Sequence, residues 1–179
     1  MDRINRIIKN KLFIQYIEKI KKYEEDRKFC RHDVVHFLDV CRLSEIEWLR
    51  TSPVVSVTEK EASCSFVGRE ETDFVNREFL YAAGLLHDIG RWQEYESGIS
   101  HEIASANLAS FILEDCGFSK EETEVITNAI ANHRNSEIKD QHSLSGFLYR
   151  ADKTSRPCYL CEVQKECNWP VTKKNLEIR

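Results

Sequence analysis

Histidine and aspartate side chains that can bind metal ions recur at wide intervals along this 179-residue chain. They are His36, the adjacent His87 and Asp88, His101, His133 and Asp152. Imidazole nitrogens suit Fe, Mn, Zn, Co and Ni, and carboxylates add hard oxygen ligands, whereas a pure Mg or Ca site would use more oxygens. The residue types therefore predict divalent transition-metal ions if the fold brings these side chains together, and they leave the metal unspecified.

Apolar periodicity and helix-end signals place each of these residues on a helix or at its end. The expected helical segments are residues 4–20, 31–50, 73–90, 100–117, 119–130 and 144–151. The buried stripe of the first segment is expected to be Ile4, Ile8, Leu12, Tyr16 and Ile20. Gly90 is expected to stop the third helix, and Ser119 with Glu122 forms a capping box. His133 and Asp152 extend the apolar stripes of the last two helices.

A single inward-pointing histidine is more often a hydrogen-bonded core residue than a ligand. However, buried ionisable groups are costly unless they are paired or coordinated. Four histidines and two aspartates on successive helix faces of one small protein therefore favour a shared metal centre.

Strand-like segments are scarce, and the chain has only 3 prolines and 6 glycines. The sequence thus predicts an all-α fold, a single-domain helical bundle over residues 1–179 with a core at about 31–156. Residues 51–71 would form a loop or small hairpin insertion, either a lid or an inert segment. Residues 157–179 would form a cysteine-rich tail.

The net charge of −4 argues against duplex nucleic acid or an anionic membrane as the main partner. No apolar run approaches the roughly 20 residues that span a bilayer, and the first ten residues lack the apolar core of a secretory signal. The 7 cysteines, an odd number, suit thiols or metal ligands in a reducing compartment better than a disulfide framework. We therefore expect a cytoplasmic protein, and its oligomeric state is not predicted.

The order and spacing of the histidines and aspartates resemble those of the HD-domain superfamily of metal-dependent phosphohydrolases. His36 opens a motif similar to the family's His-x-x-x-Val, and Leu-Leu-His87-Asp88-Ile-Gly looks like its His-Asp signature. Asp152, within Ala-Asp-Lys, looks like its closing aspartate. The resemblance spans about residues 31–156 and implies an all-α fold in which His36, His87, Asp88 and Asp152 bind one metal ion.

His101 and His133 match two further histidines of the superfamily's two-metal branch, which includes diadenosine tetraphosphate hydrolases and HD-GYP cyclic-dinucleotide phosphodiesterases. In that branch the aspartate of the His-Asp pair bridges both ions, which implies this role for Asp88. The resemblance therefore implies two ions rather than one. No Gly-Tyr-Pro signature follows the metal residues, which weakens a cyclic-dinucleotide assignment.

The candidate catalytic residues are Asp88, His32, Arg91 and Lys153. His32 precedes His36 by four residues, so the two can share a helix face. This pair resembles the His-x-x-x-His pair of cyclic-nucleotide phosphodiesterases, in which the first histidine protonates the leaving oxygen. The alternative is that His32 only supports the metal ligands. Arg91, Lys153 and Arg156 can contact a substrate phosphate; the alternative is that the two arginines are ordinary surface residues.

A second feature is the run Cys158-x2-Cys161-x5-Cys167. A Cys-x-x-Cys pair is half of a structural zinc site, and three thiolates require a fourth ligand. Cys30 is available but distant in sequence, so packed thiols without a metal are the alternative.

Together these features predict a metal-dependent phosphohydrolase that uses metal-activated hydroxide to cleave a phosphoester or phosphoanhydride of a small phosphorylated compound. The resemblance favours a nucleotide. One alternative is a di-iron oxygenase of the same superfamily, which shares the six ligands. Another is a non-catalytic, metal-stabilised module that binds a ligand or partner. The complete set of candidate ligands argues against this module, because a purely structural site needs no open coordination positions.

Overall fold

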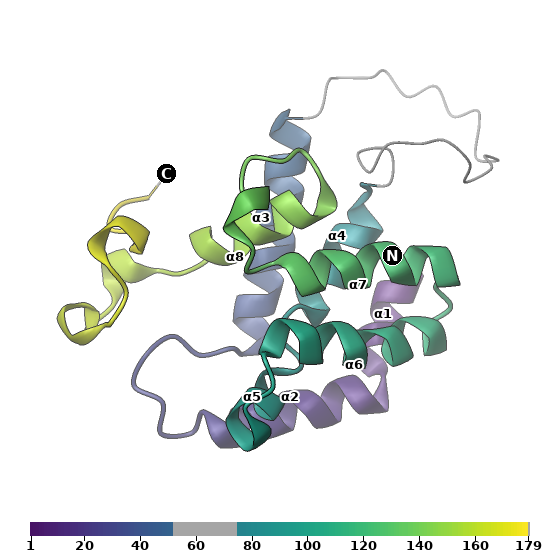
Figure 1. Cartoon of the computed structure of the whole chain (residues 1–179), viewed down its shortest axis with the longest axis horizontal. Coiled ribbons are helices and arrows are strands. Elements are labelled where there is room, and N and C mark those ends of the chain that lie inside the picture. The colour runs from purple at the N-terminus through teal and green to yellow at the C-terminus, as the bar shows by residue number, and fades with distance from the viewer. Residues whose placement is uncertain (52–74, 179) are drawn as a thin grey trace.

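The computed structural model describes residues 1–51 and 75–178, which form a bundle of α-helices with no strand in these two ranges (Figure 1). The α-helices are α1 (Asp2–Lys9), α2 (Lys11–Tyr23), α3 (Val34–Thr51), α4 (Arg77–Leu86), α5 (Arg91–Ser97), α6 (His101–Asp115), α7 (Lys120–Asn132) and α8 (Leu144–Thr154). None of the helices described is both long and apolar enough to cross a bilayer. The all-α class is confirmed, whereas the predicted insertion lies, from residue 52 onward, outside the described residues.

Helix α4 is the central helix of the bundle. It contacts α1, α3, α6, α7 and α8, and its residues from Phe79 to Leu86 are buried except for Tyr81. A helix that is apolar on nearly every face is stable only when surrounded by others. The C-terminal end of α4 therefore delivers His87 and Asp88 to the interior of the molecule.

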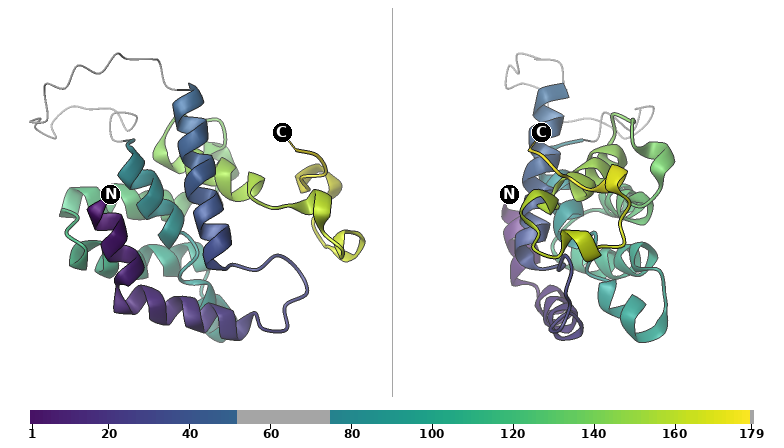
Figure 2. Two further views of the ribbon diagram at one scale, coloured as in Figure 1. Left: turned by 180° about the vertical axis from the view of Figure 1, so that it is seen from behind. Right: turned by 90° about the vertical axis from the view of Figure 1, so that its left-hand side faces the viewer.

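The predicted first helix is two helices, and the prediction of one continuous segment over 4–20 was wrong. The chain turns sharply between α1 and α2 (Figure 2). The side-chain oxygen of Asn10 accepts hydrogen bonds from the backbone N–H groups of Leu12 and Phe13 at 2.8 and 3.4 Å, which caps α2. The break changes the buried face, so Ile8 and Leu12 are exposed. The buried apolar residues of the two helices are Ile4, Ile7, Phe13 and Ile20.

Gly90 begins a helix rather than ending one, which corrects a second prediction. Helix α4 ends at Leu86, and Gly90 is the N-cap of α5, a helix that the apolar pattern did not predict. The Gly90 amide donates to Ser105 Oγ at 2.9 Å, and a Cβ at Gly90 would lie 2.3 Å from the Ser105 amide nitrogen. The turn after Asp88 is therefore packed directly against α6. The predicted capping box of Ser119 and Glu122 is confirmed at the start of α7.

We expect Gly84→Ala to destabilise the fold by about 1–3 kcal/mol, because α3 and α4 approach too closely for another methyl group. A Cβ at Gly84 would lie 2.6 Å from Cys41 Sγ and 3.1 Å from the Cys41 backbone nitrogen. At an open helical position the same change stabilises by roughly 0.5–1 kcal/mol. Urea unfolding with an unchanged m-value measures the difference, and a gain in stability would contradict the close packing.

Candidate metal centre

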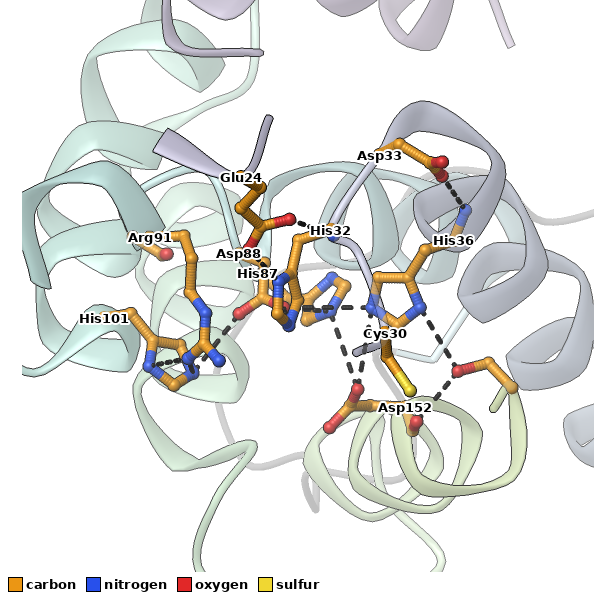
Figure 3. Close-up of polar contacts among 12 residues, drawn as sticks. Glu24, Cys30, His32, Asp33, His36, His87, Asp88, Arg91, His101 and Asp152 are labelled. Atoms are coloured by element: carbon orange, nitrogen blue, oxygen red, sulfur yellow. Dashed lines mark hydrogen bonds and ion pairs between the residues drawn. The ribbon is translucent and has the colours of Figure 1, made fainter. Parts of the chain in front are cut away.

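All six predicted metal ligands come together at the centre of the bundle, although they belong to widely separated segments. Figure 3 labels all of them except His133. His36 lies on α3, His101 begins α6 and Asp152 lies on α8. The other three follow helix ends: His87 and Asp88 come after α4, and His133 is the C-cap of α7. Five helices thus position one cluster of imidazoles and carboxylates.

One oxygen of Asp88 faces the first group of candidate ligands. Asp88 Oδ2 lies 3.3 Å from His87 Nε2 and 3.8 Å from His36 Nε2. Asp152 completes this group, with Oδ1 3.7 Å from His36 Nε2 and 4.0 Å from His87 Nε2. The four residues offer ligand atoms that all lie within 4.8 Å of one another, so one metal ion could reach all four.

The other oxygen of Asp88 faces a second group. Asp88 Oδ1 lies 3.3 Å from His101 Nε2 and 3.6 Å from His133 Nε2. These three residues also offer ligand atoms within 4.8 Å of one another, and all three are buried. Asp88 is therefore common to both groups and presents a different oxygen to each.

Each of the four histidines is held through Nδ1, which leaves Nε2 to face the carboxylates. The partners of the four Nδ1 atoms are Ser155 Oγ for His36 at 3.3 Å, Gly84 O for His87 at 2.8 Å, Glu94 Oε2 for His101 at 2.8 Å and Ile130 O for His133 at 2.6 Å. Hydrogen bonds of this kind fix the tautomer and orientation of metal-binding imidazoles. The local structure around His36, His87 and His133 is thus suited to ligation through Nε2. At His101, Arg91 Nη1 also lies 2.5 Å from Nδ1 and 3.1 Å from Nε2, so this arginine must move aside for Nε2 to bind a metal ion.

Several atoms that face the two groups are buried without a hydrogen-bond partner. They are His36 Nε2, His87 Nε2 and Asp88 Oδ1. Leaving polar atoms buried and unpaired is costly, and native proteins rarely do so without a reason. Divalent cations would satisfy these atoms, so the residues present fit metal ions of the kind that their chemistry predicts.

The shared residue Asp88 and its neighbour His101 are in protonation states that suit metal binding. Burial would raise the pKa of Asp88, but the nearby charges of His87 and His32 hold it well below its usual range. Burial lowers the pKa of His101 to about 3. The charge of Asp88 acts in the opposite direction, and the charge of Arg91 lowers the pKa further. At neutral pH Asp88 is therefore an anion and His101 is neutral, which are the forms that bind metals.

His32 lies beside the cluster and is oriented by Glu24, a buried carboxylate that the sequence analysis missed. His32 Nε2 lies 3.7 Å from Asp88 Oδ2, and its Nδ1 lies 2.5 Å from Glu24 Oε1. Glu24 also accepts from the His32 amide at 2.7 Å and from the Tyr95 hydroxyl at 2.6 Å. Burial would raise the pKa of Glu24, but His32 and Tyr95 lower it to about 2. Glu24 is therefore ionised and fixes the orientation of the His32 ring.

The cluster forms part of the wall of a cavity of about 140 Å³ that is rich in cations. Its cationic lining residues are Arg27, Arg31, Arg91, Arg134, Lys153 and Arg156. The acidic lining residues are Asp88 and Asp152, so positive charge predominates locally although the chain carries a net charge of −4. The predicted residues Arg91, Lys153 and Arg156 all face this cavity. Lys153 Nζ lies 2.5 Å from Asp152 Oδ2.

An all-α bundle whose central helix ends in a buried His-Asp pair, with further His and Asp side chains around it, is the arrangement of the metal-dependent hydrolase superfamily to which HD domains belong. A family model described as HD domain matches residues 36–156, and the chain therefore belongs to the HD-domain family. The chain is also 37% identical over 178 residues to an uncharacterized protein of Clostridium beijerinckii, with 99% of each chain covered. No solved structure matches it. The family predicted from the sequence is confirmed.

Proposed function

We propose that this protein is a metal-dependent phosphohydrolase that cleaves a phosphoester or phosphoanhydride bond in a small phosphorylated compound, a nucleotide by preference. The position of Asp88 carries the proposal. Its two oxygens face different groups of ligands, and Asp88 itself lines a cavity with six cationic side chains. A shared carboxylate beside a cationic cavity suits the transfer of a phosphoryl group to water.

We assign His36, His87, Asp88 and Asp152 to one divalent ion, and we assign Asp88, His101 and His133 to a second. Fe, Mn, Zn, Co and Ni all suit this mixture of imidazole and carboxylate ligands. Bound there, the ions would supply Lewis acidity toward phosphoryl oxygens and acidify water at neutral pH.

The cationic side chains hold the phosphate groups of the substrate. Arg91, Lys153 and Arg156 come from α5, α8 and the segment just after α8, so their donors enter the cavity from different directions. Charged donors placed in this way stabilise the negative charge that develops during phosphoryl transfer. The cavity is smaller than the roughly 300 Å³ of sites that enclose drug-sized ligands. It therefore encloses the phosphate groups and leaves the rest of the substrate outside.

His32 acts as the general acid. Its Nδ1–H donates to Glu24, and its Nε2 points toward Asp88 and the ligand cluster. A proton held on Nε2 by the adjacent carboxylates is available to the leaving oxygen of the substrate. Glu24 is a positioning residue in this scheme, because it contacts His32 and does not line the cavity.

The test is a hydrolysis assay on chelator-treated protein reloaded separately with Fe(II), Mn, Co, Ni, Zn or Mg. p-Nitrophenyl phosphate, its bis ester and a panel of nucleoside mono-, di- and triphosphates serve as substrates. We expect hydrolysis that requires added metal, rises until two ions are bound per chain and proceeds equally well without oxygen. Turnover that depends on oxygen would indicate an oxygenase instead. Fully loaded protein that hydrolyses none of these compounds would contradict the proposal.

A further inference from the structure

The C-terminal tail, residues 157–178, lies as a separate lobe beyond the end of α8 (Figures 1 and 2). It contains three short 3₁₀ helices, η3 (Cys158–Leu160), η4 (Gln164–Glu166) and η5 (Val171–Lys173), none of which has a buried residue. Its large apolar side chains point outward: Leu160 is 78% exposed and Ile178 is 82% exposed. A short segment without an apolar core usually requires a disulfide or a metal ion to hold its shape.

The cysteines of the tail are less exposed than its large apolar side chains. Cys158, Cys161 and Cys167 are all half-buried free thiols. The Cys161 amide donates to the Cys158 carbonyl at 3.2 Å, which closes the turn of η3. Residues three apart in a 3₁₀ helix lie on the same side of it. The Cys-x-x-Cys pair is therefore arranged as one half of a metal-binding site.

A fourth thiol comes from the loop between α2 and α3. Cys30 and Cys167 line the same cavity, and Lys28 forms an ion pair with Glu166, which ties this loop to η4. Burial raises the pKa of Cys30, and the neighbouring thiols of Cys158 and Cys161 raise it further, while Arg156 lowers it. The thiol that was distant in sequence therefore lies on the same cavity wall as Cys167. Gln164, three residues before Cys167, donates its side-chain amide to the Cys158 carbonyl at 2.8 Å, which ties Cys158 to the same part of the tail.

We propose that Cys30, Cys158, Cys161 and Cys167 bind one Zn²⁺ ion that fastens the tail to the loop preceding His32. Four thiolates are the ligand set of closed, tetrahedral structural zinc sites. Such a site carries a net charge of −2, and the cationic residues of the adjacent cavity offset this charge. No three of the described thiols have sulfurs that all lie within 4.8 Å of one another, so the proposal requires these side chains to move closer together when zinc binds.

The proposed zinc ion would shape the wall of the hydrolytic cavity. Cys30 is two residues before His32, and Cys167 is two residues before Trp169. All four of these residues line the cavity, and Trp169 packs against Arg156, whose guanidinium carbon lies 4.3 Å from the ring centre. Removal of the zinc would therefore release one side of the cavity together with the tail.

The experiment measures zinc in full-length protein that carries Asp88→Asn, because this change weakens the His/Asp centre and leaves the thiols intact. After loading with zinc and desalting, we expect about one zinc ion per chain. Adding Cys158→Ser and Cys161→Ser should remove it, whereas adding Cys116→Ala, a buried cysteine at the end of α6, should not. Cobalt in place of zinc should give a thiolate charge-transfer absorption that the double cysteine variant lacks.

A second measurement reports on the tail itself. Trypsin cleavage after Lys165 and Lys173 should be about tenfold slower with zinc bound, because cleavage requires local opening. Since no side chain in the three 3₁₀ helices is buried, the cysteine variants should keep the helical far-UV spectrum of the bundle. The proposal is overturned if the Asp88→Asn protein retains no zinc or if the double cysteine variant retains as much. Iron with acid-labile sulfide in place of zinc would overturn it as well.

Discussion

Asp88→Asn is expected to lower hydrolysis by about 10²–10³-fold, a loss as large as that caused by removing a single oxyanion-stabilising group. Asparagine has nearly the same shape but no charge, and only one of its two terminal atoms can accept or ligate. One of the two ligand groups would therefore lose its contact with residue 88, and both would lose its negative charge. Turnover and the number of ions bound by the His/Asp centre should fall together, while far-UV helicity remains.

Asp140→Asn is the matched control for this change. Asp140 is also an aspartate, but its side chain is 87% exposed and pairs only loosely with Lys139 at 3.9 Å. The control should keep full activity and full metal content. An Asp88→Asn protein that hydrolyses substrate at the wild-type rate with two ions in the centre would refute the shared-ligand assignment.

His32→Gln should separate substrates according to their leaving groups. For an alkyl phosphoester, whose leaving oxygen needs a proton, we expect kcat to fall by roughly 10²–10⁴-fold. For p-nitrophenyl phosphate the loss should be much smaller, because p-nitrophenolate departs without a proton. His142→Gln is the control, since His142 is exposed and contacts Thr51 Oγ1 at 2.9 Å. Equal losses on both substrates would show that His32 is not the proton donor.

Glu24→Gln extends this prediction to the residue that positions His32. The amide keeps the shape of the side chain but cannot stabilise a protonated ring as a carboxylate does. We expect kcat for an alkyl phosphoester to fall with little change in KM, and we expect a much smaller loss for p-nitrophenyl phosphate. A residue with a purely structural role would lower both activities equally. Glu24→Asp should restore part of the activity toward the alkyl phosphoester.

The clustering of the six candidate ligands could be predicted from the sequence because their chemistry is rare and their order is informative. An apolar helix face tolerates His133 or Asp152 only if something compensates it, and this constraint is visible in the residue pattern. The all-α class followed from the same periodicity. Both inferences rest on residues whose side-chain type already restricts where they can lie.

The residues that orient the ligands could not be predicted in the same way. Glu24 lies in an acidic run with Glu25 and Asp26, and only tertiary packing distinguishes the buried carboxylate from its exposed neighbours. Glu94 lies on α5, a helix of 7 residues that is too short for periodicity to reveal. The break at Asn10 was missed for a related reason, because an asparagine that lies off the expected apolar stripe, between Ile8 and Leu12, suits an exposed helical position as well as an N-cap.

The origin of the ligands on five separate helices has a consequence for how the protein acquires its structure. An ion held by His36 and Asp152 joins nearly opposite ends of the HD domain and acts as a non-covalent cross-link that closes a long loop. Binding energy of this kind is also folding energy, since the unfolded chain has no preformed site. Metal supply would therefore set how stable the native state is, and a chelator would lower the urea concentration at which the protein unfolds.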